Sequence, residues 1–191
     1  FSTLFLVAFL ARLISVYFMG KKYEPKLVLN KKLQFSFLEF VKKMPHNNFG
    51  KFAMYSSLIN FAVYIAAPFF SVYLLKDLQL SYTKFTIAAV SSGIATLIGI
   101  PLWGKFGDKY GNIKVLKICG FLIPIVPLLF VFSSNFYYIV IIQFYSGLVW
   151  SGFNISSANF VFDATSVQRR ATCDAYNTIL IGFGAFVGAM L

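Results

Sequence analysis

The sequence predicts an all-α integral membrane protein, a bundle of about six transmembrane helices. Of its 191 residues, 59% are hydrophobic and only 12% are charged, against about 45–50% and about 25% in soluble domains. The mean hydropathy is +0.75, and 24 residues are phenylalanine. Since a soluble domain of this size has too little interior to bury so much apolar surface, a soluble enzyme domain, a disordered tail and a disulfide scaffold are all excluded.

Long apolar runs define the expected spans. A helix needs about 20 mostly apolar residues to cross about 30 Å of hydrocarbon. The runs show no period-2 alternation, and lipid leaves no partner for free backbone groups, so we expect helices rather than barrel strands. Arg12 is the one charge within a run, and it either reaches the membrane surface or packs in the bundle, with a cavity charge as the alternative. The expected spans are residues 1–19 and about 52–75, 85–104, 115–132, 136–162 and 175–191.

Residues 20–51 form the one long connection and carry eight lysines. Within it, Ser36 and Glu39 have the spacing of a capping box, and Phe35 and Phe40 that of a hydrophobic staple. Pro45 cannot continue a helix. We therefore expect a short amphipathic helix at about 36–44, lying in the membrane interface, with a plain solvated linker as the alternative.

The net charge of +11 indicates topology rather than nucleic-acid binding. Basic residues gather in three loops, at 20–51, 104–117 and 163–174, whereas the opposing connections contain only Lys76 and Lys84. Because positively charged loops stay on the cytoplasmic side, the three basic loops are predicted to be cytoplasmic. The first span then runs from outside to inside.

Residues 104–114 carry the most informative pattern, with Gly104, Asp108, Lys109, Gly111 and Lys114 in the order G-x-x-x-D-K-x-G-x-x-K. We expect the first glycine to end a helix, the aspartate to accept charge-assisted hydrogen bonds, and the second glycine to adopt a positive φ. A contact of this kind, made in one state only, biases a two-state equilibrium. The alternative is a polar turn with no switching role.

This motif resembles the loop signature of the major facilitator superfamily, although Asn112 and Ile113 stand where that family often has basic residues. The resemblance implies two six-helix halves, each built from inverted three-helix repeats. Residues 1–19 would correspond to helix six, 20–51 to the central linker, and 52–191 to a C-terminal half truncated in its fifth helix. Because the chain begins inside an apolar run, we expect the N-terminal half of the same protein to be missing from this sequence.

Two further features follow from the same resemblance. Asp163, Arg169 and Arg170, in the loop 163–174, resemble the acidic-to-arginine segment of the family's second repeat. The stretches at residues 47–52 and 162–164 resemble uncharacterised prokaryotic permeases of the family, which implies the plasma membrane of a prokaryote.

Polar side chains inside the spans mark a candidate substrate cavity, because such groups are costly in lipid and usually face a bundle interior. The family's helices seven and ten line its central cavity, and both carry such residues here. The alternative is hydrogen bonding between helices, at about 0.6 kcal/mol per pair. The candidates are Asn60 and Tyr64 in the second expected span and Gln143, Trp150 and Asn154 in the fifth.

The resemblance therefore implies a secondary transporter that moves a small molecule or ion across the bilayer by alternating access, with loop 104–114 as its gate. A non-transporting membrane sensor or assembly subunit is the alternative. No phosphate-binding or catalytic motif is present, so we expect no enzyme activity and no cofactor. The two cysteines and the absence of metal-ligand spacing predict neither a disulfide framework nor a metal site.

Overall fold

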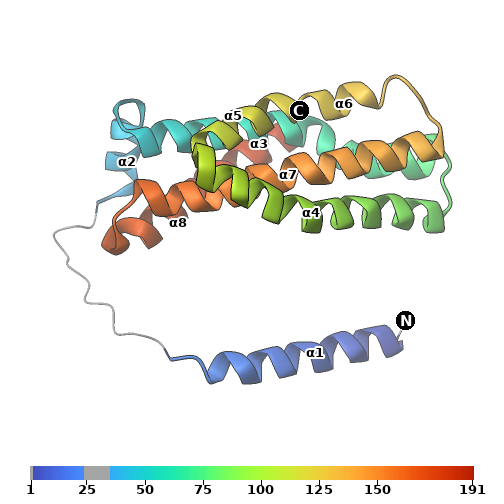
Figure 1. Ribbon diagram of the computed structural model, residues 1–191, viewed down its shortest axis with the longest axis horizontal. Helices are drawn as coiled ribbons and strands as arrows, with labels where there is room; N and C mark the ends of the chain where they lie inside the picture. Colours follow the sequence, from blue (N-terminus) through green and yellow to red (C-terminus); the bar gives the residue numbers. More distant parts are fainter. Residues whose placement is uncertain (1, 24–34) are drawn as a thin grey trace. The chain divides into compact units, whose positions relative to one another are not determined.

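The computed structural model describes residues 2–23 and 35–191 (Figure 1), and all of the regular structure in them is helical. The chain divides into two units, Phe1–Lys31 and Lys32–Leu191. The part of the expected linker that includes Lys26, Lys31 and Lys32 lies outside the described residues.

The first unit contains helix α1, Ser2–Gly20. This helix is long and apolar enough to cross a membrane. Arg12 lies near its middle, and at its C-terminal end the Lys21 ammonium sits 4.5 Å from the centre of the Tyr17 ring.

The second unit is a bundle of long helices that run side by side (Figure 1). The turn η2 precedes the bundle, and the π-helical turn η3 extends α3 at its far end. In chain order the elements are α2 (Phe37–Lys43), η2 (Met44–His46), α3 (Asn48–Val72), η3 (Tyr73–Asp77), α4 (Tyr82–Tyr110), α5 (Asn112–Leu122), α6 (Ile125–Leu129), α7 (Phe136–Ala164) and α8 (Val167–Ala189).

Five of the described helical segments are long and apolar enough to span a membrane, and α8 is not among them. Its first turns carry Arg169, Arg170 and Asp174, so its apolar part is short. Helix α4 continues past the expected span 85–104 to Tyr110, and α8 begins at Val167, before the expected span 175–191. Charge marks where the apolar part of a helix stops, but it does not end the helix.

The expected span 115–132 is interrupted, with α5 ending at Leu122 and α6 beginning at Ile125. The reason lies in Pro124, which has no N–H to donate to the preceding turn. Pro68, by contrast, lies inside α3 without ending it.

Helix α2 begins with the capping box that its sequence encodes. The Ser36 hydroxyl accepts from the Glu39 N–H at 3.3 Å, and the Glu39 carboxylate accepts from the Ser36 N–H at 3.4 Å. Phe40 is buried, with its ring centre 5.9 Å from that of Phe49 and 5.6 Å from that of Tyr176. This side of α2 therefore packs on the start of α3 and against Tyr176 of α8, whereas Leu38 remains exposed.

The long helices pack in two close pairs, α4 with α7 and α3 with α8. In the first pair a methyl group at Gly147 would collide with the Ser92 carbonyl, and Thr96 donates to the Gly147 carbonyl at 3.3 Å. In the second pair Ser57 donates to the Leu180 carbonyl at 2.7 Å. Small residues at the crossings let the backbones approach closely enough for these bonds.

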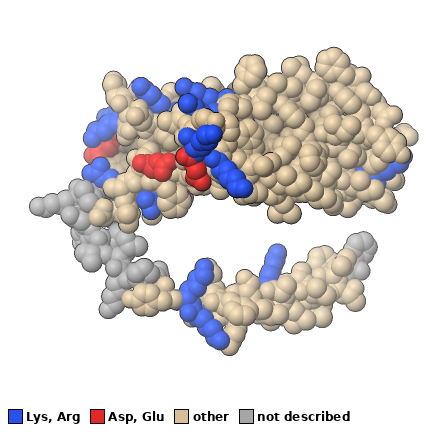
Figure 2. Space-filling model, viewed as in Figure 1, with Lys and Arg blue, Asp and Glu red and all other residues tan. Residues whose placement is uncertain are grey.

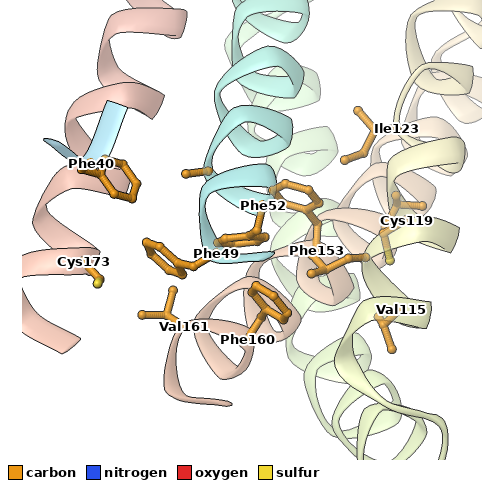
Figure 3. Close-up of a cluster of buried hydrophobic side chains, with 13 residues drawn as sticks. Phe40, Phe49, Phe52, Val115, Cys119, Ile123, Phe153, Phe160, Val161 and Cys173 are labelled. Carbon is orange, nitrogen blue, oxygen red and sulfur yellow. The ribbon is translucent and has the colours of Figure 1, made fainter. Parts of the chain in front are cut away.

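An aromatic cluster joins the two pairs at one end of the bundle (Figure 3). Phe49 and Phe52 of α3 point towards Phe160 and Val161 of α7, and the rings of Phe52 and Phe160 lie 4.7 Å apart. Phe153, about two helical turns before Phe160 on α7, packs beside them. These contacts fix the spacing between α3 and α7, the two helices that carry the predicted cavity residues.

Candidate functional site

All five predicted cavity residues line one pocket of about 560 Å³. Helix α3 contributes Asn60 and Tyr64, and α7 contributes Gln143, Trp150 and Asn154. The structure thus brings together polar side chains from two segments that are more than 70 residues apart in the sequence.

These side chains are largely free to bind a ligand. Asn60 donates through Nδ2 to the Ser56 carbonyl of its own helix at 2.9 Å, which leaves its amide oxygen unused. Within residues 2–23 and 35–191, the side chains of Tyr64, Gln143, Trp150 and Asn154 make no hydrogen bond to protein. None of the five therefore bridges two helices in this structure.

Sequence reasoning missed part of the pocket lining. Ser146 also lines it, and its spacing from Gln143 and Trp150 on α7 could have revealed it. Besides α3 and α7, the interrupted α5–α6 segment also lines the pocket. All of its lining residues are apolar, so nothing in the sequence distinguished them from residues that face lipid. These residues are Ile123, Pro124, Val126, Pro127 and Phe130.

The loop motif forms a second site at one end of the bundle. The Asn112 amide donates through Nδ2 to Oδ2 of Asp163 at 2.8 Å, which joins the start of α5 to the end of α7. Gly111 separates α4 from α5 with φ of +91°, the positive φ expected from the sequence. Gly107 is buried, and a methyl group there would lie 2.9 Å from the Asn112 side-chain oxygen.

The expectation for Gly104 was wrong. It lies inside α4, which ends six residues later at Tyr110, and nothing lies within 4 Å of a methyl group placed on it. The glycine that ends the helix is Gly111. Its backbone leaves the helical region of φ and ψ, and glycine adopts this positive φ without the steric clash that a Cβ atom would cause.

The charged side chains of the two loops contact aromatic rings. Lys109 and Lys114 lie 5.1 and 5.7 Å from the centre of the Tyr110 ring. Arg170 lies 4.4 Å from the Phe162 ring and donates to the Phe162 carbonyl at 3.3 Å. Arg169 lies 6.0 Å from the ring of Phe35, the first described residue of the second unit.

Asp108 is exposed at the end of α4, and among the described residues it makes no hydrogen bond or ion pair. The charge-assisted contact expected for it is therefore absent from this conformation. The one carboxylate of the two loops with a side-chain hydrogen-bond partner is Asp163.

The described residues contain no group of three or more His, Cys, Asp or Glu side chains able to hold a metal ion. Cys119 and Cys173 are both buried free thiols. At Cys173, which precedes the apolar part of α8, burial raises the pKa of the thiol and the nearby Arg169 partly opposes that rise.

Long apolar helices around a pocket with a polar wall define an integral membrane helical bundle. The sequence profile of the Major Facilitator Superfamily matches residues 52–191, and the chain belongs to this family. The resemblance seen in residues 104–114 is thereby confirmed. Members of the family are transporters of small molecules or ions. No solved structure matches the chain.

Proposed function

We propose that this chain forms one wall of the pathway in a secondary transporter, which moves a small solute across the membrane by alternating access. The observation that carries the proposal is the single pocket lined by Asn60, Tyr64, Gln143, Trp150 and Asn154, inside the region that matches a transporter family. The opposite wall would come from a second six-helix half, encoded by the same gene or supplied by another chain.

The loop 104–114 is proposed to act as the gate. The support is the bond between Asn112 and Asp163, because α7 carries both Asp163 at its end and four polar pocket residues along its length. A bond of this kind that forms in one state and breaks in the other shifts the population of the two. Asp108 would then find its partner in the state that this structure does not represent.

The proposed orientation places loops 104–117 and 163–174 in the cytoplasm. Figure 2 shows Lys and Arg gathered at the end of the second unit where α2 and the start of α8 lie, with few at the other end. We name this the basic end, after Lys51, Lys105, Lys109, Lys114 and Lys117. The opposite end carries Lys76 and Lys84, and the imbalance favours the basic end as cytoplasmic.

The proposal is tested by access to the pocket from each side. Ser146→Cys, in a background with Cys119→Ala and Cys173→Ala, places a thiol in the pocket. We expect an impermeant maleimide to label it both in right-side-out and in inverted vesicles prepared from cells that express the complete open reading frame. Labelling from one side only would contradict alternating access.

The gate is tested in the same background with Asp108→Asn. We expect normal expression and a several-fold change in the ratio of the two labelling rates, because the charged acceptor is lost in one state only. Asp77→Asn, at the opposite end of the bundle, serves as the matched control. An unchanged ratio in the Asp108 variant would refute the gating role.

A further inference from the structure

Every residue that lines the pocket is uncharged. From this we infer the class of solute: an uncharged molecule with a flat apolar or aromatic part and hydrogen-bonding groups of both kinds, donor and acceptor. The inference rests on the proposed function and narrows it.

The first step concerns charge. Moving an ion out of water costs several kcal/mol even after the protein relaxes, and only a paired and hydrogen-bonded partner offsets that cost. The lining offers no carboxylate, ammonium or guanidinium group. None of the lysines and arginines in the described part of the second unit lines the pocket. A solute that presents a charge to this wall is therefore penalised relative to a neutral one of the same shape.

The second step concerns hydrogen bonds. Asn60 presents only an acceptor, since its amide nitrogen is already bonded to the Ser56 carbonyl. Gln143 and Asn154 present donors and acceptors, and the Trp150 indole N–H is a donor only. A solute with both kinds of group satisfies the wall, whereas a pure hydrocarbon would leave these groups unpaired at about 1–3 kcal/mol each.

The third step concerns shape. Phe70 of α3 and Phe130, just beyond α6, lie with ring centres 5.0 Å apart on the apolar side of the pocket. Trp150 is held edge-on by Phe153, with ring centres 5.6 Å apart at an angle of 79°. A planar ring fits against such surfaces, and aromatic pairs contribute about 0.5–1.5 kcal/mol beyond the area that they bury. The volume of about 560 Å³ suits a small organic molecule, within the roughly 300–1,000 Å³ typical of ligand pockets.

These 191 residues contain two tryptophans, and the one in the pocket lining, Trp150, reports on binding there by its fluorescence. Trp103 lies outside the lining, with its indole N–H bonded to the Leu148 carbonyl at 2.8 Å. Trp103→Phe therefore leaves Trp150 as the single tryptophan of this chain, and excitation at the red edge of indole absorption avoids its tyrosines. Subtracting the spectrum of Trp150→Phe from that of the unmodified protein isolates the same signal, should Trp103→Phe fail to fold.

The probes are 4-bromophenylacetamide, 4-bromophenylacetate and 4-bromophenethylamine, which share one ring and differ in charge. Bromine quenches indole fluorescence on contact. With the purified protein in nanodiscs, we expect saturable quenching of Trp150 by the neutral amide, at a concentration at least about tenfold lower than for either ion. Trp150→Phe, which keeps Trp103, corrects for simple partitioning of the probes into the lipid.

Two variants connect the quenching to the wall. Asn154→Leu and Gln143→Met keep the branching of each side chain and remove the amide, so we expect each to raise the half-saturating concentration of the amide probe several-fold. Equal or tighter binding of either ion, or no saturable quenching by the amide, would overturn the inference. If Ser146→Cys is labelled from both sides while an ion binds best, the solute class is wrong and transport stands. If Ser146→Cys is labelled from one side only while the amide probe binds more tightly than the two ions, the inferred solute class stands and the proposed transport by alternating access is wrong.

Discussion

The side-chain amide of Asn112 donates a hydrogen bond of 2.8 Å to the carboxylate of Asp163, and so joins the two loops at the basic end of the bundle. Asn112 stands at a position where the family often has a basic residue. The link is thus a hydrogen bond between a neutral donor and a carboxylate rather than an ion pair. Because hydrogen bonds to a charged group are stronger than neutral ones, the contact still holds α5 to the end of α7.

The first prediction concerns this link. Asn112→Ala removes the donor, and we expect the labelling rate of Ser146→Cys from the basic end to rise several-fold as the contact that holds the two loops is lost. Asp163→Ala is expected to give the same rise, and the double variant no more than either single one, because both remove the same bond. Additive effects of the two single variants would show that the bond does not couple them. Lys84→Ala, at the opposite end of the bundle, where the ammonium lies 5.6 Å from the centre of the Phe136 ring, is the matched control.

The second prediction separates the two motif glycines. Gly111 has φ of +91° and ψ of 142°, a conformation that costs a residue with a side chain about 1–3 kcal/mol. Gly104 is helical with open space around it, so alanine there gains up to about 1 kcal/mol in helix propensity. We expect Gly111→Ala to lower the free energy of unfolding and Gly104→Ala to leave it equal or higher, as measured by circular dichroism during SDS titration. Equal losses in both variants would contradict this division of roles.

The contrast between the two glycines shows what the sequence could supply. The motif was enough to predict the family and the positive φ of Gly111. It did not predict where α4 ends, because the spacing alone does not show which of the two glycines leaves the helical conformation. The polar wall of the pocket was predictable because Gln143, Trp150 and Asn154 share one face of a helix. The apolar wall was not, since Ile123 or Phe130 looks the same in sequence whether it faces lipid, protein or a pocket.

The third prediction tests the close packing of α4 against α7. A methyl group at Gly147 would meet the Ser92 carbonyl, which is backbone and cannot rotate away. We expect Gly147→Ala to destabilise the bundle by about 1–3 kcal/mol, as overpacking of well-packed cores does. Gly93, on α4, has nothing within 4 Å of an added methyl group, so Gly93→Ala is the matched control. The thermal midpoints of the two variants in detergent give the comparison, and similar midpoints would refute the close crossing.

The fourth prediction concerns the attachment of the segment before α3 to α8. The Tyr176 hydroxyl donates to the Phe35 carbonyl at 2.8 Å, and its ring also meets the ring of Phe37 at 5.3 Å. Tyr176→Phe removes only the hydrogen bond, worth about 0.5–1.5 kcal/mol. We expect faster cleavage by trypsin at Lys42 and Lys43, which lie exposed in α2. Tyr137→Phe, at an exposed tyrosine of α7, should leave the cleavage rate unchanged, and equal rates in the two variants would show that the bond does not hold α2.

The fifth prediction fixes the orientation of the bundle. Lys109 lies at the basic end and Ser134 in the connection between α6 and α7 at the opposite end, and both are exposed. The native thiols interfere little with labelling, because Cys119 and Cys173 are 0% and 7% exposed and burial raises the pKa of the Cys173 thiol. A raised thiol pKa means less of the reactive thiolate at neutral pH.

We therefore expect an impermeant maleimide to label Lys109→Cys only in inverted vesicles and Ser134→Cys only in right-side-out vesicles or intact cells. Positive charge on the cytoplasmic side is the physical reason, because basic loops resist translocation. The unsubstituted protein measures any background from the two native thiols, and detergent-permeabilised vesicles confirm that both introduced cysteines are reactive. The reverse pattern would place the Asn112–Asp163 contact outside the cell, and the gate would then close the external rather than the cytoplasmic entrance.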